Sequence, residues 1–331
     1  MNAALLLART LRDPASAAHL SASEWTTLFA VARAEQLIGT LATRIQGVAM
    51  PRDAVAIVRD ALAAADQGRT AALWEAEMAR RALGDIPFVL LKGTAFVAAG
   101  LEAGRGRSIG DLDILVSRAR LDEAEAMLLA AGWEWVKPDH YDDAYYRKWM
   151  HELPPLIHRD RDRMIDVHHT ILPLTARITP DAEAMLDAAV PLGNGCRHPS
   201  PNDMLCHAAA HLFADGDLAG GMRNLWDIRC LIDQFGTEGL EARAEHHGLA
   251  GQMTRAIRLA QALYGPEPLA GTAGGWGDRL YLRRLTARDE WGRPTRKLTR
   301  LAFYVRSHWI RMPPVMLARH LWAKWRKGQT P

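Results

Sequence analysis

The chain has 331 residues, which at about 150 residues per domain is enough for roughly two domains with a sizeable core. With 49% hydrophobic residues, 24% charged residues and a net charge of +3, the composition excludes collagen-like, wholly disordered and membrane-bundle classes. No apolar run approaches the roughly 20 residues that would cross a bilayer, so we expect neither an anchor nor a signal peptide. Three cysteines without metal or disulfide spacing favour a reducing, cytoplasmic setting.

The first part of the chain has a helical pattern. Ser21 followed three residues later by Glu24 is typical of a capping box at a helix N-terminus. A second, long helix is expected after Pro51, because apolar residues recur there every three or four positions, although Gly68 weakens its middle. We therefore predict an N-terminal helical region over residues 1–80.

Residues 81–195 combine short apolar runs with helical segments, which predicts a small mixed sheet. Strands are expected where such runs are bounded by turn residues, and helices where the period changes. Two of the expected strands form an antiparallel hairpin around residues 159–162. The expected strands are 88–91, 112–116, 133–136, 151–158 and 163–168, and the expected helices are 94–101 and 121–131.

Residues 196–331 return to a helical pattern after a segment rich in proline and glycine. The apolar periodicity predicts helices over 201–213 and 222–235. The whole chain is therefore expected to be an α+β protein, with a small mixed β-sheet core between N-terminal and C-terminal helical regions.

The most informative string is Gly110-Asp111-Leu112-Asp113, because alternate residues of a strand point to the same face. Two carboxylates side by side at the end of a buried strand favour a bound cation, and hard oxygen ligands favour Mg²⁺. A pair of solvated turn aspartates is the alternative. Asp166, in another apolar strand, would complete a trio able to hold two Mg²⁺ ions, an arrangement typical of phosphoryl or nucleotidyl transfer.

Several other residues near these strands carry the chemistry that a nucleotide requires. Lys92-Gly93-Thr94 lies at an expected strand-to-helix turn, where backbone N–H groups can receive a phosphate. We expect Lys92 and Arg107 to neutralise phosphate charge, although either could be a solvated loop residue. His168 shares a strand face with Asp166 and could orient the acceptor or accept its proton, or could be bonded within the sheet.

The ordered set of motifs resembles the polymerase-β-like nucleotidyltransferases, and within them the bacterial group of uncharacterised nucleotidyltransferases. The resemblance implies that Asp111, Asp113 and Asp166 are metal ligands, and that Gly93 and Thr94 contact a triphosphate. It implies a nucleotidyltransferase core over residues 81–195. The motifs are Leu90-Leu91-Lys92-Gly93, Arg107, Asp111-Leu112-Asp113-Ile114-Leu115-Val116, Gly132-Trp133 and Ile165-Asp166-Val167-His168-His169.

These observations predict a Mg²⁺-dependent enzyme that moves a nucleoside monophosphate from an NTP such as ATP to a hydroxyl-bearing acceptor, with release of diphosphate. The acceptor could be a small molecule, a peptide or a protein. A nucleotide-binding sensor without catalysis is one alternative. A helical metal hydrolase is another, because His207 and His211 are four residues apart on an expected helix and Asp227 lies on the next.

The C-terminal end of the chain is strongly basic. After Glu290 there are ten Lys or Arg and no acidic residue, so subtracting 10 from the net charge of +3 leaves residues 1–290 at −7. Interleaved tryptophans make contact with nucleic acid, an anionic membrane or an acidic partner one interpretation. The other is a packed helix pair with a solvated basic face, broken at Pro313-Pro314.

Overall fold

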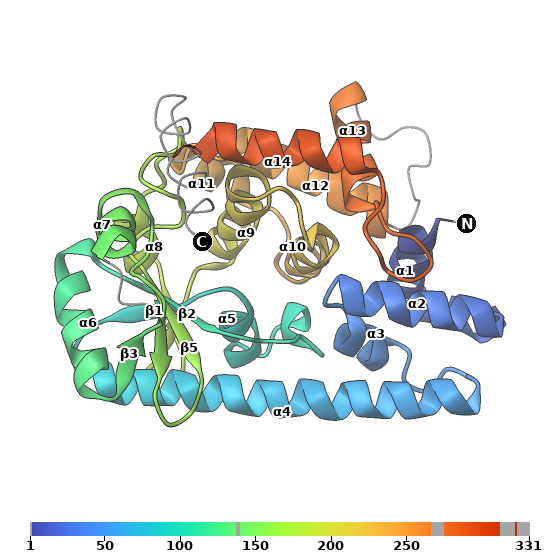
Figure 1. Cartoon of the computed structure of the whole chain (residues 1–331), viewed down its shortest axis with the longest axis horizontal. Helices are drawn as coiled ribbons and strands as arrows, with labels where there is room; N and C mark the ends of the chain where they lie inside the picture. The colour runs from blue at the N-terminus through green and yellow to red at the C-terminus, as the bar shows by residue number, and fades with distance from the viewer. Residues whose placement is uncertain (1, 137–139, 266–274, 312–321, 323–331) are drawn as a thin grey trace.

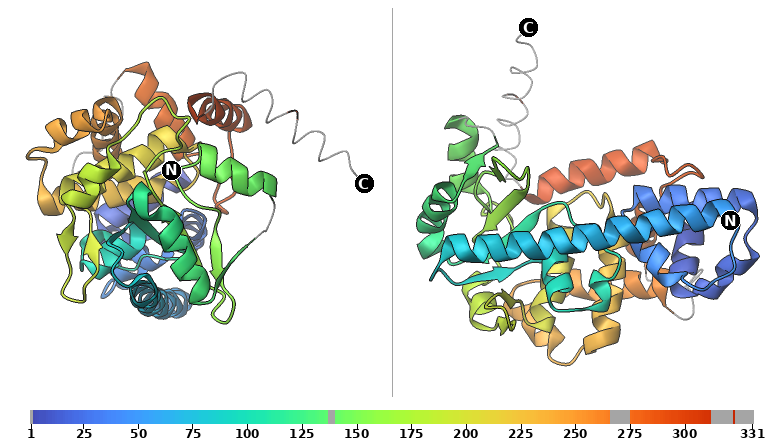
Figure 2. Two further views of the ribbon diagram at one scale, coloured as in Figure 1. Left: turned by 90° about the vertical axis from the view of Figure 1, so that its left-hand side faces the viewer. Right: turned by 90° about the horizontal axis from the view of Figure 1, so that it is seen from below.

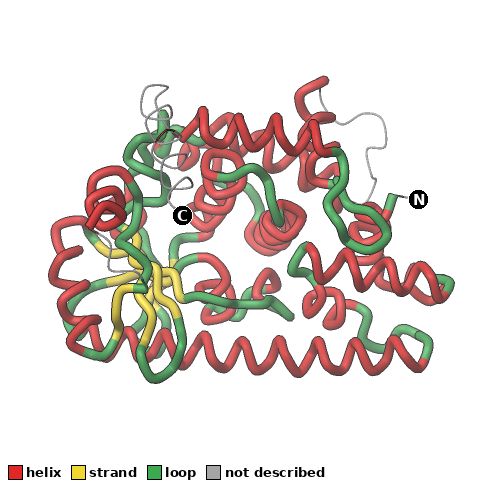
Figure 3. Tube along the Cα trace, viewed as in Figure 1, coloured by secondary structure: helices red, strands yellow, loops and turns green. Residues whose placement is uncertain are grey.

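The computed structural model describes residues 2–136, 140–265, 275–311 and 322. Helices surround one five-stranded sheet, which lies at one end of the molecule (Figures 1 and 3). This arrangement confirms the expected α+β class with helical regions before and after the sheet. None of the described helices has the length and apolarity needed to span a membrane. The domain boundaries after residues 80 and 195 stay a prediction.

The N-terminal region is helical, as expected, and it includes a first helix before the predicted capping box that the sequence pattern did not indicate. The predicted capping box is present, because the Ser21 side chain accepts from the Glu24 backbone and the Glu24 carboxylate accepts from the Ser21 backbone. One uninterrupted helix runs under the sheet and the other N-terminal helices, and it continues through Gly68 (Figure 2). The elements are α1 (Ala3–Arg12), a 3₁₀ turn (Pro14–His19), α2 (Ala22–Ala34), α3 (Ile38–Arg44) and α4 (Arg52–Leu83).

The main sheet has the strand order β1-β2-β5-β4-β3. β2 and β5 are parallel, whereas the other three neighbouring pairs of this sheet are antiparallel. All five residues of β2 are buried, which is why its sequence is almost continuously apolar. The strands are β1 (Phe88–Leu90), β2 (Leu112–Val116), β3 (Trp133–Trp135), β4 (Leu156–His158) and β5 (Met164–His168).

The predicted hairpin forms, but its first strand is shorter than expected. Leu156 pairs with Ile165, whereas residues 151–153 pair separately with the far end of β5. Pro154 and Pro155 lie between the two stretches, and a proline has no N–H to donate to a strand ladder. The expected strand over 151–158 is therefore wrong in its first half.

Three helices connect the strands: α5 (Lys92–Ala98), α6 (Leu121–Ala130) and α7 (His140–Trp149). The helix expected over 94–101 begins two residues earlier and ends sooner, because Gly100 adopts a φ of +66° that an α-helix cannot continue through. The helix α7 was not predicted from the sequence. Short 3₁₀ turns cover Glu102–Gly104 and Arg118–Arg120.

The C-terminal region packs helix on helix above the sheet, with α10 against α9 and α12. The helix expected over 201–213 ends at Ala210 and continues as one π-helical turn, His211–Asp215. The helices are α8 (Ala182–Asp187), α9 (Pro201–Ala210), α10 (Gly221–Phe235), α11 (Leu240–His246), α12 (Ala250–Tyr264), α13 (Trp276–Leu285) and α14 (Lys297–Arg311), and a small ribbon joins β6 (Val190–Pro191) to β7 (Arg197–His198).

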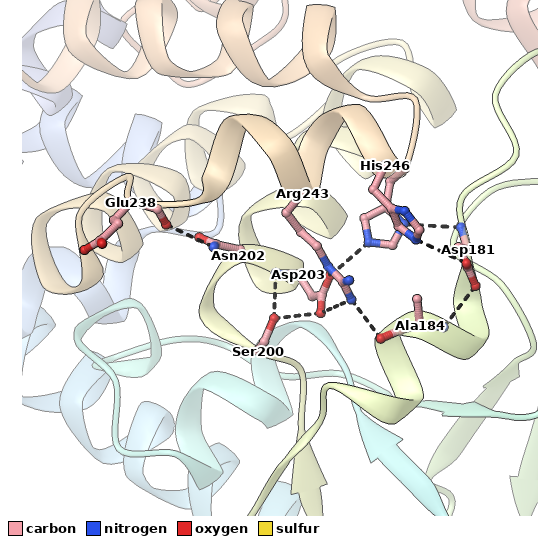
Figure 4. A network of polar contacts seen from close by, with 9 residues as sticks. Asp181, Ala184, Ser200, Asn202, Asp203, Glu238, Arg243 and His246 are labelled. Carbon is pink, nitrogen blue, oxygen red and sulfur yellow. Dashed lines mark hydrogen bonds and ion pairs between the residues drawn. The ribbon is translucent and has the colours of Figure 1, made fainter.

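A buried carboxylate ties three of these helices together (Figure 4). Asp203 on α9 is 0% exposed and accepts from Arg243 Nε at 2.6 Å. Asp203 Oδ2 also accepts a hydrogen bond from the Ser200 hydroxyl, and Oδ1 lies 3.0 Å from His247 Nε2. Arg243 donates onward to the Ala184 carbonyl of α8 at 2.8 Å. A buried charge with this many partners fixes how α8, α9 and α11 meet.

The last part of the basic tail, including the expected break at Pro313-Pro314, lies outside the described residues, which exclude 312–321 and 323–331. Within the described part, Arg306 donates to the Phe213 carbonyl at 2.8 Å and Arg296 donates to the Thr286 hydroxyl at 3.1 Å. These arginines are used within the fold. Tail contact with nucleic acid, an anionic membrane or an acidic partner stays a prediction.

Candidate functional site

Three acidic side chains meet where β2 and β5 run side by side. The parallel register places Asp113 directly opposite Asp166. Asp111 lies two residues before Asp113, at the bend where the chain enters β2. One ligand atom from each of the three carboxylates lies within 4.8 Å of the others. The structure therefore brings together the acidic trio predicted from the sequence, in a geometry that could hold a metal ion.

Asp113 is the buried member of the trio, with a side chain only 4% exposed. It accepts from Lys92 Nζ at 2.6 Å, and His168 Nε2 lies 2.9 Å from the same Oδ1. Burial raises the pKa of Asp113, but the charges and hydrogen bonds of Lys92 and His168 more than reverse this and hold that pKa far below its usual range. Asp113 is therefore a fixed, fully ionised carboxylate.

Asp166 has the opposite environment. Burial and the nearby carboxylates of Asp113 and Glu152 raise the pKa of Asp166 to about 7. Its Oδ1 is buried and has no hydrogen-bond partner within the described residues. A divalent cation among the three carboxylates would satisfy this oxygen and offset the repulsion, and an all-oxygen donor set suits Mg²⁺. The residues present thus fit the metal that the sequence predicted.

Lys92 occupies an unusual backbone position at the start of α5. Its φ is +48°, in the left-handed region that a residue with a Cβ rarely adopts. This turn directs the side chain across to β2, where Nζ meets Asp113. Lys92 also lines the adjoining cleft and its side chain is 28% exposed. Its predicted contact with phosphate stays a prediction, but its contact with Asp113 was not foreseen.

The other three residues expected to bind phosphate differ in how they are placed. A Cβ on Gly93 would lie 2.5 Å from Arg107 Nε, so glycine is required for the arginine to pass. Arg107 donates to Asp227 on α10 and lies over the Phe96 ring. Thr94 is only 1% exposed and is not among the residues that line the cleft, and its expected phosphate contact stays a prediction.

An open cleft of about 620 Å³ lies beside the acidic trio. It is large enough for a drug-sized or nucleotide-sized ligand. The α2–α3 segment contributes one wall, a contribution that no sequence motif indicated. The lining residues are Arg33, Gln36, Ile38, Lys92, Gly93, Arg107, Ser108, Ile109, Gly110, Asp111, Asp113 and Met164.

His168 does not face this cleft. It is 1% exposed, and Nε2 contacts Asp113. Direct contact with an acceptor is therefore not supported, because the ring is enclosed. The alternative interpretation, in which His168 is hydrogen-bonded within the sheet, agrees better with this geometry. Its partner there is Asp113, a member of the acidic trio.

The helical cluster considered as a hydrolase centre has a different arrangement. Asp227 is ion-paired with Arg107 and with Arg223, whose Nη1 lies 3.4 Å away. In the described part of the chain, the side-chain groups that could hold a metal do not include His207, His211 or Asp227. Burial holds the pKa of His207 well below its usual range. These residues form a polar wall between α5, α9 and α10 around a small pocket of about 50 Å³.

Glu152 is another residue near the site that sequence reasoning missed. It pairs across an isolated antiparallel bridge with His168 and adds negative charge beside Asp166. The only local signal is its place between His151 and Leu153, ahead of two prolines, and this pattern has no recognisable periodicity.

Comparison with known proteins agrees with this geometry. No curated protein matches the chain. Residues 21–265 match a family described as uncharacterised nucleotidyltransferase, a stretch that includes the acidic trio, the cleft and the helices around them. The wider polymerase-β-like relationship stays a prediction. Because the match covers well over half of the sequence, the chain belongs to this nucleotidyltransferase family.

Proposed function

We propose that this protein is a Mg²⁺-dependent enzyme that transfers a nucleoside monophosphate from an NTP, with ATP as the candidate donor, to a hydroxyl-bearing acceptor. The observation that carries the proposal is the convergence of Asp111, Asp113 and Asp166 beside an open cleft of about 620 Å³. Three carboxylates at one point favour a doubly charged cation, and a cation beside a cleft of this size suits a polyphosphate ligand.

The acidic trio would hold the metal, with two Mg²⁺ ions as the expected number. When bound, Mg²⁺ supplies charge neutralisation for the triphosphate and polarises the attacking oxygen. The trio itself fixes where that charge is delivered, since Asp113 and Asp166 sit on paired strands and cannot move independently. Catalysis of this kind depends mainly on position and charge.

Lys92 and His168 act on the site through Asp113. Both contact the same oxygen, Oδ1, which leaves Oδ2 for a metal. They offset the cost of burying this carboxylate and hold its orientation. Arg107 and Gly93 line the same cleft, where the guanidinium and the close backbone approach suit a phosphate.

The proposed reaction balances without another reactant. The acceptor oxygen forms a bond to the α-phosphorus, and the bond from that phosphorus to the α–β bridging oxygen breaks. Diphosphate leaves with the bonding electrons, and the hydroxyl proton passes to solvent in the open cleft. Neither an oxidant nor a reductant is needed.

Transfer of label tests the proposal. Purified protein, Mg²⁺ and each α-labelled NTP are incubated with cell extract, and labelled macromolecules and metabolites are separated. We expect one labelled acceptor class with wild type and loss of labelling with Asp111→Asn. Asp160→Asn is the matched control, because that aspartate lies exposed in the β4–β5 turn.

Two results would reject the proposed activity. Equal labelling by wild type and Asp111→Asn would remove the acidic trio from the reaction. Calorimetric binding of NTP with no transfer to any acceptor would favour the nucleotide-sensor alternative. A small molecule, a peptide and a protein acceptor are distinguished by the size of the labelled product.

A further inference from the structure

A second group of potential ligands lies behind the acidic trio, and we call it the histidine cluster: His151, Glu152 and His168. One ligand atom from each lies within 4.8 Å of the others. The isolated bridge sets Glu152 opposite His168, and directly opposed residues of an antiparallel pair share a face. The ring of His151 stacks on that of His168 with centroids 5.2 Å apart. All three side chains are thus held by the backbone pairing of residues 151–153 with β5.

The distances in this cluster suit metal ligands better than hydrogen bonds. Glu152 Oε2 lies 3.4 Å from His168 Nδ1 and 3.6 Å from His151 Nε2. In a tetrahedral zinc site, bonds of about 2.0–2.1 Å separate neighbouring donor atoms by roughly 3.3–3.4 Å. A cation between these atoms would therefore need only small adjustments of the side chains.

A buried ring nitrogen of His168 supplies a second, independent observation. His168 Nε2 lies 2.9 Å from Asp113 Oδ1, and a carboxylate oxygen accepts, so the ring donates to Asp113 from Nε2. The opposite nitrogen, Nδ1, faces Glu152 Oε2. That nitrogen is buried in a residue only 1% exposed, and it has no hydrogen-bond partner within the described residues. A ligating histidine whose other nitrogen donates to a carboxylate is the usual arrangement at zinc sites.

We propose that His151, Glu152 and His168 form a second metal site, selective for Zn²⁺ or a similar borderline divalent cation over Mg²⁺. Two imidazole nitrogens and one carboxylate oxygen favour such a cation, whereas the acidic trio offers oxygen alone. Three protein ligands leave a fourth position for water or a ligand oxygen. Asp113 links the two sites, because His168 donates to it from the zinc side. The inference does not depend on the proposed transferase activity.

Cobalt titration of the full chain tests this site directly. Protein stripped with EDTA is titrated with Co²⁺ in excess Mg²⁺, which occupies the acidic trio, and visible absorption reports Co²⁺ coordination. We expect one equivalent of Co²⁺ to give the intense bands of a four- or five-coordinate ion, and Zn²⁺ to displace it. No thiolate charge-transfer band is expected, because the three cysteines lie elsewhere. X-ray absorption on the zinc-loaded wild type should show scattering from two imidazoles.

Variants assign the ligands. His151→Gln and Glu152→Gln should each weaken Co²⁺ binding by at least about 100-fold, since even outer-shell changes cost 10–100-fold. His246→Gln is the matched control, because His246 also faces a carboxylate, Asp181 at 3.2 Å, but on the surface. It should bind Co²⁺ as wild type does. Asp111→Asn should also leave Co²⁺ binding intact.

Three outcomes would overturn the inference. The first is absence of stoichiometric Co²⁺ or Zn²⁺ binding by wild type, which would mean that a proton rather than a metal separates His168 from Glu152. The second is wild-type affinity in folded Glu152→Gln. The third is loss of Co²⁺ binding in Asp111→Asn with retention in Glu152→Gln, which would assign the ion to the acidic trio. Circular dichroism checks that each variant is folded. If a variant is not folded, X-ray absorption on the zinc-loaded wild type decides, because the absence of imidazole scattering would overturn the inference.

Discussion

Replacing Asp166 by asparagine should stabilise the metal-free protein. Burial and neighbouring carboxylates raise the pKa of Asp166 from 3.8 to about 7. A group whose pKa is raised by folding contributes stability that is complete below its unfolded pKa and is lost as the pH rises through its folded pKa. The metal-free wild type should therefore lose stability between about pH 4 and pH 7, and Asp166→Asn should not.

The magnitude follows from the size of the shift. About three pKa units at 1.36 kcal/mol per unit set an upper limit of about 4 kcal/mol on the penalty above pH 7. Between pH 5 and pH 8 the stabilising effect of Asp166→Asn should grow by about 2–3 kcal/mol. Asparagine is nearly the same size, and the buried Oδ1 of Asp166 has no hydrogen-bond partner within the described residues to lose.

Urea unfolding in EDTA at both pH values measures this effect, with Asp160→Asn as the exposed control. Saturating Mg²⁺ should then reverse the order of stability, because a ligand that binds only the folded protein stabilises it by an amount that grows with the logarithm of the free ligand concentration above Kd. Wild type should gain stability with Mg²⁺, whereas Asp166→Asn should not. A destabilised Asp166→Asn at pH 8, or an effect of equal size at both pH values, would refute the reasoning.

Three further predictions concern the scaffold. Gly68→Ala should raise the free energy of unfolding by about 0.5–1 kcal/mol in urea melts, because a Cβ at this helical position meets nothing within 4 Å. Asp203→Ala should lower the free energy of unfolding by about 3–5 kcal/mol, because it leaves Arg243 without its buried partner. Asp233→Ala breaks the half-exposed ion pair with Arg229 and should lower the free energy of unfolding by less than about 1 kcal/mol. Burial raises the pKa of Cys206 to about 12, so a thiol reagent at pH 8 should modify this cysteine only after denaturation, and modification in the native protein would contradict the described burial.

Local patterns in the sequence predicted the individual strands of the site better than their partners. The buried run from Leu112 to Val116 is a strand with the expected bounds, and the later run to His168 is a strand that begins one residue after the expected start. Their parallel pairing brings Asp113 opposite Asp166 across more than fifty residues of chain. The resemblance to a nucleotidyltransferase family supplied that long-range information, since alternation along a strand says nothing about which strand lies beside it.

The side chains that complete the site were harder to predict, because their roles depend on backbone details. Lys92 contacts Asp113 from a backbone position with a positive φ, and no residue type signals that conformation here. Glu152 faces His168 because two prolines interrupt the strand and leave a separate short pairing. The helix α7 was missed because its residues combine polar and aromatic types without a clear apolar stripe.

The two acids on the paired strands show how this sheet tolerates charge. A buried strand that carries an ionised carboxylate must supply partners for it, and Lys92 and His168 do so for Asp113. Asp166, at the same level of the neighbouring strand, keeps a buried oxygen without a hydrogen-bond partner within the described residues. A sheet that needed only stability would be served as well by an apolar residue at that position. Asp113 has hydrogen-bond partners for its charge, whereas the buried oxygen of Asp166 has none within the described residues. This difference is the physical reason for placing a cation between the two carboxylates.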